Sequence, residues 1–424
     1  MIHWHFDRTI STADYQNSVP AVSPLPQALR QRLGQCLGMA VALWVVLLGC
    51  STTAIASEVI PEITPEITPE ITSELPGMSL RYFGSEPLVS ALPPGDAITD
   101  GKALLRYALP IDNKPIREVQ REIEGISERL RIQGSRAVKG VKRNVKRAER
   151  AMGKPEKILA DVRPEHELEA KQLLDRVRTG LADLNTYAEE RDKEAIWIKR
   201  AEMLSQIGQI EEFMVSDLPI DVPEEYSTLP QLKGRATVEM ATDKGTMLIT
   251  VDGYNAPVTA GNFIDLVQRG FYDGLPVVRE EEFYVVQMGD PDGPEDGFVD
   301  PNTGEQRTIP MEIAVQDDDE PVYGMTLEQV GLYLADPVLP FSAYGTLAMA
   351  RPDNDPNGAS SQFFFLRFES ELTPAGINLL DGRYAVFGYV VENDEVLDKL
   401  RVGDLIQSIT VVNGADNLVQ PGQT

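Results

Sequence analysis

The feature that most constrains this fold is a change in the spacing of apolar residues midway along the chain. Between residues 96 and 214, apolar residues recur every three or four positions, as amphipathic helices require. The four stripes begin at Ile116, Val138, Leu174 and Met203. From Gly234 onward the spacing drops to two, which is typical of half-buried strands. The pattern therefore predicts a multidomain chain in which an all-α domain precedes a mainly-β domain.

The helical stripes predict four helices that pack against one another. Gly134, Gly153-Lys154-Pro155 and Arg191-Asp192 separate the stripes, and residues of these types commonly end helices. Four amphipathic helices with short connections are typical of an antiparallel bundle. An intermolecular coiled coil is the alternative, but the stripes are short and loops intervene between them. A bundle over residues 95–216 is the better interpretation.

An apolar run near the N-terminus predicts export. Arg30 and Arg32 precede the uncharged stretch 37–48, which is too short to span a bilayer and is typical of a signal peptide. The pattern Ala54-Ile55-Ala56 fits cleavage after its last residue. Cleavage before Cys50, which would leave a lipidated cysteine at the new N-terminus, is the alternative. Both interpretations place the protein outside the compartment where it is made.

Proline-rich and acidic stretches separate the predicted parts. Three Pro-Glu-Ile-Thr units lie between Pro61 and Thr72, and a proline at every fourth position favours an extended spacer over a helix. The predicted organisation is a leader at 1–56, a Pro-rich linker at 57–94, the bundle at 95–216, an acidic linker at 217–231, the β domain at 232–415 and a tail at 416–424.

Composition excludes several classes of chemistry. The net charge of −27 argues against nucleic acid as a partner, because binding to phosphates needs a basic surface. The only cysteines, Cys36 and Cys50, lie in the leader, and His166 is the one histidine beyond it. A mature chain of this kind has no disulfide framework, thiol nucleophile or His/Cys zinc cluster. We therefore expect no metal and no cofactor.

One predicted helix, residues 136–150, is strongly basic. Its cations are Arg136, Lys139, Lys142, Arg143, Lys146, Arg147 and Arg150, against the single acid Glu149. A solvated face, a peripheral contact with anionic lipid headgroups, and docking of an acidic segment of the same chain remain open. The acidic loop 290–320, which contains the run from Asp317 to Glu320, is the candidate for such intramolecular docking.

Three blocks in the β domain occur in an order known from one family. The central block runs from Gly345 to Phe365 and ends in Gln362-Phe363-Phe364-Phe365. Upstream, Gly270-Phe271-Tyr272-Asp273-Gly274 is followed by Arg279 and Gln287. Downstream lies Leu380-Asp381-Gly382-Arg383-Tyr384-Ala385-Val386-Phe387-Gly388. Together these blocks resemble the signature of the cyclophilins, which implies a closed β-barrel with two helices and peptidyl-prolyl isomerase (rotamase) activity.

Prolyl isomerisation needs little chemistry beyond binding. The barrier of roughly 20 kcal/mol comes from the double-bond character of the amide, and a placed cation can stabilise the twisted transition state. By resemblance, Arg279 is the catalytic arginine and Gln287 positions it. The resemblance also implies substrate contacts from Tyr284, Val285, Met349, Ala350, Arg351, Gln362, Phe364, Leu379, Leu380 and Tyr384.

Departures from the family pattern predict weak turnover. Tyr284 and Val285 replace a Phe-Met pair of the proline pocket, and Leu379 stands where some members have tryptophan. The acidic run Glu280–Glu282 follows Arg279 directly, and an arginine–carboxylate pair would draw the guanidinium away from a substrate. We therefore expect peptide binding to be more robust than isomerisation.

A helical bundle joined to a divergent cyclophilin domain resembles the large two-domain cyclophilins of the thylakoid lumen. That subgroup is associated with assembly and maintenance of photosystem II. The resemblance implies a lumenal chaperone for proline-containing segments of photosystem II subunits. The alternative is a fully active, general prolyl isomerase for exported proteins in the lumen or periplasm.

Overall fold

The computed structural model describes residues 98–422 except 133, 217–219, 295, 319 and 369–377. The predicted leader with its signal peptide and Cys50, and the Pro-Glu-Ile-Thr spacer, lie outside the described residues. Within the described part, no helix combines the length and apolar character needed to cross a bilayer.

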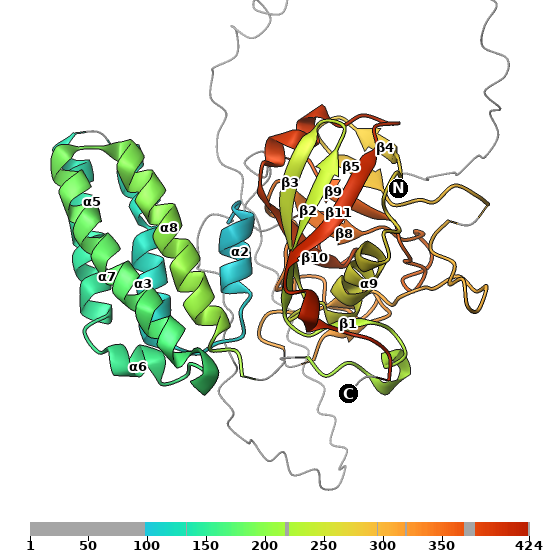
Figure 1. The fold of residues 1–424 in the computed structure, drawn as a ribbon, viewed down its shortest axis with the longest axis horizontal. Helices are drawn as coiled ribbons and strands as arrows, with labels where there is room; N and C mark the ends of the chain where they lie inside the picture. The colour runs from blue at the N-terminus through green and yellow to red at the C-terminus, as the bar shows by residue number, and fades with distance from the viewer. Residues whose placement is uncertain are drawn as a thin grey trace, which may run out of the picture. The chain divides into compact units, whose positions relative to one another are not determined.

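The first domain is a helical bundle, as predicted. Figure 1 shows its long helices side by side: α3 (Lys114–Glu124), α5 (Ser135–Ala151), α7 (Glu167–Glu190) and α8 (Lys193–Glu212). The short helices α4 (Ile126–Arg131), α6 (Pro155–Leu159) and η1 (Pro164–His166) join them. The predicted stripes meet in one apolar cluster, in which Val145, Val177 and Ile207 are fully buried. The bundle is therefore held by the faces that the spacing identified.

Polar caps and one glycine set the helix ends. The Asn113 side chain accepts the Ile116 N–H at 3.1 Å, and Asp192 accepts the Ala195 N–H at 2.9 Å. The stripe that starts at Ile116 is split at Gly125 into α3 and α4. A Cβ atom at Gly125 would lie 2.9 Å from Asn144 Nδ2 of α5, so a larger residue there would require the Asn144 side chain to move.

The helix α2 (Gly101–Tyr107) does not pack in the bundle core. Its residues Leu104 and Leu105 belong to the apolar core of the β domain. The carbonyls at its C-terminal end are bonded from that domain, because Arg235 donates to the Leu105 oxygen and Asn255 Nδ2 donates to the Ala108 oxygen at 3.0 Å. The helix α2 thus contacts both domains, because its Arg106 also pairs with Glu124 of α3 at 2.9 Å.

Arg235 joins several segments through buried charge. Its Nε lies 2.8 Å from Asp252 Oδ2, and its Nη1 lies 3.1 Å from Glu212 Oε1 at the end of α8. The Asp252 side chain is fully buried, so the pair with Arg235 compensates a carboxylate that water cannot reach. One side chain of the β domain thus contacts α2 and α8 together.

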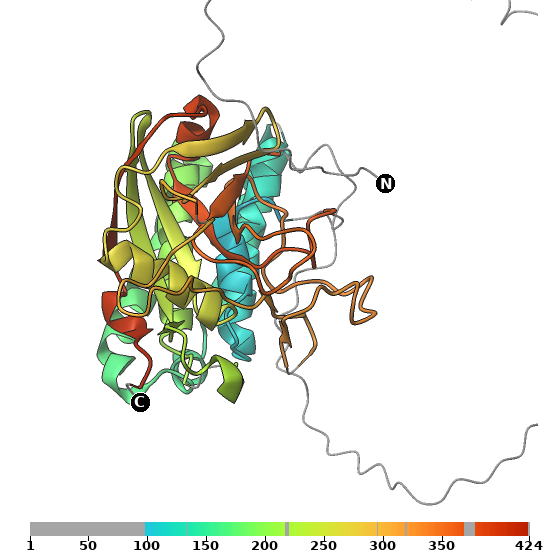
Figure 2. The same ribbon diagram turned by 90° about the vertical axis from the view of Figure 1, so that its right-hand side faces the viewer.

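The second domain is an antiparallel barrel, shown from two sides in Figures 1 and 2. The strand order is β11-β2-β3-β10-β8-β9-β5-β4. Their bounds are β2 Arg235–Thr242, β3 Gly245–Asp252, β4 Val277–Glu281, β5 Val285–Met288, β8 Thr346–Met349, β9 Phe363–Leu366, β10 Val386–Glu392 and β11 Ile406–Asn413. The edge strands meet, since the Val277 N–H donates to the Asp404 oxygen at 2.8 Å and the Gly403 N–H to the Val277 oxygen at 2.9 Å. These bonds close the barrel, as the family resemblance implied.

Two helices accompany the barrel among its described residues, as the family resemblance implied. α9 (Pro257–Gln268) is the one α-helix among the described residues of 232–415, and the second helix is the short 3-10 segment Asp394–Lys399. Two-stranded sheets lie outside the barrel, one formed by β1 (Gln231–Leu232) with β12 (Leu418–Val419) and one by β6 (Glu312–Ile313) with β7 (Val322–Tyr323).

The barrel core is a cluster of aromatic rings around α9. The Phe263 ring centroid lies 5.3 Å from those of Tyr272, Phe363 and Phe387. All four side chains are fully buried. The contact with Phe363 is edge-on, a geometry that adds stabilisation to the burial of apolar area.

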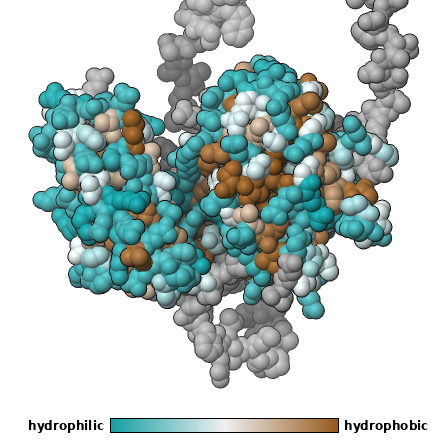
Figure 3. All heavy atoms as spheres, viewed as in Figure 1, coloured by the Kyte–Doolittle hydropathy of each residue, from teal (hydrophilic) through white to brown (hydrophobic). Residues whose placement is uncertain are grey.

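The basic face of α5 is largely unpaired. Lys142 pairs with Glu189 at 2.6 Å and Arg147 with Glu122 at 3.4 Å, both within the bundle. Among the described residues, the remaining cations of the face make no ion pair or side-chain hydrogen bond: Arg136, Lys139, Arg143, Lys146 and Arg150. Figure 3 shows that the visible surface of the bundle is mostly hydrophilic.

The bundle contains a buried carboxylate, Glu211 on α8, that makes stability depend on pH. Its side chain is fully buried, its Oε1 lies 3.3 Å from Arg117 Nη1, and its Oε2 has no partner among the described residues. Burial raises the pKa of Glu211 from 4.5 to about 7. The protonated form therefore favours folding, and this contribution, complete below pH 4.5, is lost as the pH rises through about 7.

We expect Glu211→Gln to remove this dependence. Between pH 5 and pH 8, the free energy of unfolding in urea should fall by on the order of 2 kcal/mol more for the wild type than for the variant. The exposed Glu194→Gln, on the same helix, should follow the wild type at both pH values. Equal pH profiles for wild type and Glu211→Gln would show that Glu211 does not titrate as described.

Candidate peptide-binding site

The two predicted catalytic side chains lie on one hairpin. Strands β4 and β5 are antiparallel, and Arg279 is directly opposite Gln287 in their register. Side chains opposite each other across an antiparallel pair project to the same face. The structure therefore brings together the residues that the sequence separates by a turn.

Arg279 is held by a carboxylate of its own strand. Its Nε donates to Glu281 Oε1 at 2.9 Å, and its Nη2 donates to the same oxygen. Residues two apart on a strand share a face, so Glu281 is placed to make this pair. Glu280 faces the other way and accepts from Arg367 Nη1 at 2.8 Å. Of the acidic run, Glu281 is thus the residue that competes for the guanidinium.

The predicted glutamines form a chain of amide hydrogen bonds. Gln287 Nε2 donates to Gln362 Oε1 at 2.7 Å, and Gln362 Nε2 donates to Asp290 Oδ1 at 2.9 Å. Asp290 orients the Gln362 amide, which in turn orients Gln287. Sequence reasoning missed Asp290, although its position soon after Gln287 and beside Gly289 marks the start of the acidic loop.

Phe364, predicted to line the proline pocket, is covered by other rings. β9 places Phe363 and Phe365 in the barrel core, and Phe364 between them points to the opposite face. The Phe341 ring stacks on Phe364 with centroids 5.9 Å apart, and Tyr384 meets it edge-on at 5.3 Å. Only 6% of Phe364 is exposed. Phe341 comes from the long segment before Gly345, and nothing in the local sequence identifies it as a site residue.

The other predicted pocket residues divide between core and surface. Val285 is buried in the barrel core, and the half-buried Leu380 packs against that core. Tyr284 is 37% exposed and Leu379 is 78% exposed. Partial burial raises the pKa of the Tyr284 hydroxyl, so it stays neutral at ordinary pH. The rim of the site is thus more open than its floor.

The strand predicted to pair with substrate backbone is β8 and its extension. The Met349 N–H donates to the Ala385 oxygen at 3.1 Å, and the Ala350 N–H donates to the Gln362 oxygen at 2.9 Å. The Arg351 guanidinium lies over the Tyr384 ring, 5.0 Å from its centroid, and its Nη2 donates to the Arg383 oxygen at 2.8 Å. Arg351 therefore braces Tyr384, and the substrate contacts of all three remain predictions.

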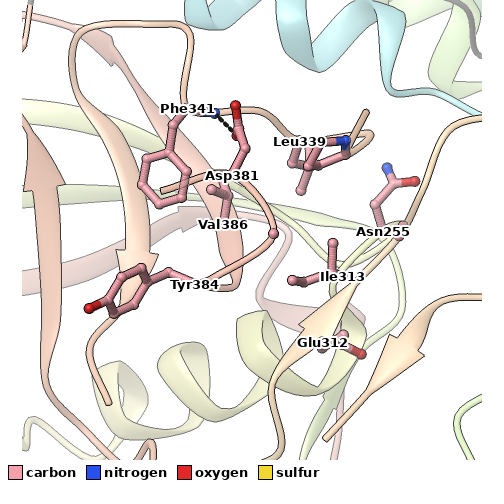
Figure 4. Close-up of a pocket in the computed structure, with 11 residues that line it drawn as sticks. Asn255, Glu312, Ile313, Leu339, Phe341, Asp381, Tyr384 and Val386 are labelled. Carbon is pink, nitrogen blue, oxygen red and sulfur yellow. Dashed lines mark hydrogen bonds between the residues drawn. The ribbon is translucent and has the colours of Figure 1, made fainter. Parts of the chain in front are cut away.

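A small cavity lies beside Phe341 and Tyr384 (Figure 4). Phe341, Tyr384, Leu339, Glu312 and Asp381 are among its lining residues. It offers water about 10 Å³, which is room for about one molecule. Asp381 accepts the Phe341 N–H at 2.8 Å, and burial raises the pKa of Asp381 to about 6. The hydrogen bond to Asp381 holds the loop that carries Phe341. The cavity itself is too small for a proline ring.

The fold and these residues define a class of protein. A closed antiparallel barrel that sets an arginine opposite a glutamine, beside a Gln-Phe-Phe-Phe strand, is the arrangement of a cyclophilin. The family model described as "Cyclophilin type peptidyl-prolyl cis-trans isomerase/CLD" matches residues 237–415. The model described as "Peptidyl-prolyl cis-trans isomerase CYP38-like, PsbQ-like domain" matches residues 100–215.

Whole-length relatives agree with both matches. The chain is 53% identical over 346 residues to sll0408 of Synechocystis sp., whose name describes a thylakoid lumen peptidyl-prolyl cis-trans isomerase; the match covers 81% of this chain and 90% of that one. It is 48% identical over 347 residues to the chloroplastic isomerase CYP38 of Arabidopsis thaliana, covering 79% and 78%. The chain therefore belongs to the two-domain cyclophilin-type isomerases with a PsbQ-like helical domain.

The pair formed by Arg279 and Glu281 should restrain turnover. Exposed ion pairs contribute about 0.2–1 kcal/mol, so releasing the guanidinium should raise isomerisation of a proline tetrapeptide by a factor between about 1.4 and about 5. We expect this gain for Glu281→Gln, measured as kcat/KM. Glu239→Gln removes the same charge from an exposed residue of β2 with no ion pair among the described residues, and it should leave the rate unchanged. Equal rates in both variants would show that Glu281 does not restrain Arg279.

Proposed function

We propose that this protein binds proline-containing segments in the thylakoid lumen and assists folding and assembly of photosystem II, with weak isomerase turnover. The observation that carries the proposal is the state of the site. Arg279 is paired with Glu281, and the Phe364 wall is covered by Phe341 and Tyr384. A peptide segment can contact exposed residues such as Tyr284 and Leu379. Arg279 and Phe364, which would act on the amide and the proline ring, are already in contact with other side chains of the protein.

Binding and turnover make different demands on such a site. Contacts that hold the substrate and the twisted transition state equally well give affinity without rate. Isomerisation needs in addition a cation at the amide and a pocket for the ring. Among the described residues, the Arg279 guanidinium is already bonded to the Glu281 carboxylate, and Phe364 of the pocket wall is 6% exposed. This imbalance supports a chaperone over a fast enzyme.

The relatives and the leader support the location. The two relatives carry names that describe a thylakoid lumen and a chloroplastic protein. The apolar run at 37–48 and the small residues that end at Ala56 are suited to export and cleavage. The match of residues 100–215 to a PsbQ-like domain, together with the resemblance to lumenal cyclophilins, supports a client among photosystem II subunits.

A fully active general prolyl isomerase for exported proteins is the second candidate. The specific observation in its favour is that Arg279 and Gln287 are both present and directly opposite in the register of β4 and β5. A substrate could displace Glu281, because that pair is partly exposed and water screens it.

Turnover and binding of one proline tetrapeptide separate the two candidates. For the chain from Ser57 to Thr424 we expect saturable binding of the peptide. We also expect its proline bond to isomerise nearly as slowly as without the protein, over tens to hundreds of seconds. Arg279→Ala should change the rate little. Arg383→Ala, which removes an exposed arginine paired with Glu328, is the matched control. Fast turnover that Arg279→Ala abolishes would establish the second candidate instead.

We further propose that the acidic loop 290–320 docks on the basic face of α5 and covers part of the groove. The support is complementary charge, since five cations of α5 lack partners among the described residues. The exposed acids Asp292, Asp317, Asp318 and Glu320 of the loop form no ion pair among those residues either. A contact made of exposed charges is sensitive to salt.

Salt should therefore increase peptide affinity. Raising NaCl from about 0.05 M to about 0.5 M shortens the screening length roughly three-fold, which should release the loop and tighten binding of an uncharged proline peptide. The double variant Lys139→Glu/Arg143→Glu should show the tighter binding already at low salt. Arg176→Glu, an exposed residue of α7 outside the basic face, should behave as the wild type. Affinity that is independent of salt in every variant would contradict docking.

A further inference from the structure

The turn between β4 and β5 holds an aromatic residue where a glycine is expected. The Tyr284 N–H donates to the Glu281 oxygen at 3.0 Å, which closes a four-residue turn from Glu281 to Tyr284. Phe283 occupies its third position with φ of 58°. That position of a turn with one positive φ is normally taken by glycine or asparagine, because a Cβ atom is strained there.

The packing of the Phe283 side chain does not compensate for this strain. The Phe283 side chain is 73% exposed. Among the described residues, it belongs to none of the three apolar clusters and makes no ring contact. The side chain of Phe283 therefore gains little stabilisation from packing, and strained residues of this kind occur at functional sites.

The position of Phe283 relates it to the site. It lies on the hairpin that carries Arg279 and Gln287, and it directly precedes Tyr284. The Tyr284 hydroxyl is close enough to Tyr384 and to Arg279 for their charges to influence its pKa. Phe283 is therefore at the end of the same rim, next to the residues that face a bound segment.

We infer that Phe283 is an apolar anchor that selects segments with a large aliphatic or aromatic side chain beside proline. This inference rests on the proposed peptide-binding function and defines its substrate class. The charge around the turn adds a second preference. Glu282 is exposed and forms no ion pair among the described residues, so a neighbouring lysine or arginine in the segment is favoured and an acidic residue is disfavoured.

The test compares three labelled peptides: Lys-Leu-Pro-Leu-Lys, Lys-Gly-Pro-Gly-Lys and Glu-Leu-Pro-Leu-Glu. The wild-type chain from Ser57 to Thr424 should bind the first about ten-fold more tightly than the other two, measured by fluorescence anisotropy. Phe283→Gly should lose about ten-fold in affinity for the first peptide and keep its affinity for the second. Leu168→Ala, which removes a side chain 71% exposed on α7, should bind as the wild type does.

Thermal unfolding distinguishes an anchor from a structural residue. Because glycine relieves the strain at a positive φ, Phe283→Gly should melt at or above the temperature of the wild type. Phe283→Ala, which keeps the strain and removes the ring, should lose affinity in the same way. A lower melting temperature for Phe283→Gly, or unchanged affinity of both variants for the leucine peptide, would overturn the inference while leaving peptide binding intact. Failure of the wild type to bind any of the three peptides would instead overturn the proposed function on which the inference rests.

Discussion

The packing of Phe363 among the buried rings of the barrel is the contact on which the site depends. Its ring meets Phe263 of α9 edge-on at 5.3 Å and Tyr272 at 5.2 Å, so β9 cannot slide or rotate without opening the core. Because side chains alternate along a strand, burying Phe363 and Phe365 turns Phe364 to the other face. The same register sets Phe364 opposite Gln287 on β5. The core thus positions the residues that a peptide would meet.

The long segment between Asp290 and Gly345 changes what this barrel can do. Glu312 anchors it, because its carboxylate accepts the Thr259 N–H at 2.9 Å and the Val258 N–H at 3.3 Å at the N-terminal end of α9, where the helix dipole favours negative charge. Tyr323 donates to the same carboxylate at 2.7 Å. From this anchored segment Phe341 reaches the Phe364 ring. The segment before Gly345 therefore covers the Phe364 ring.

Charge is used in two ways in this chain. Buried charges join segments, as Arg235 does between Asp252, α2 and Glu212, and removing either partner would leave an uncompensated ion away from water. Other charges are more exposed: Glu281 pairs with Arg279, and Glu282 is next to Phe283, whose φ is positive. The β4–β5 turn thus combines the ion pair of Arg279 with an exposed aromatic side chain at Phe283.

The sequence by itself determined the two domains, the bundle faces, the closed barrel and the neighbourhood of Arg279, Gln287 and Gln362. These follow from apolar periodicity and from ordered motifs, which act locally and leave a record in residue spacing. It did not determine that α2 packs on the barrel core, that Gly125 splits a helix against Asn144, or that Phe341 covers Phe364. Those outcomes depend on contacts between residues far apart in the chain, whose partners are chosen by shape and burial. Only the folded chain brings such residues within reach of one another.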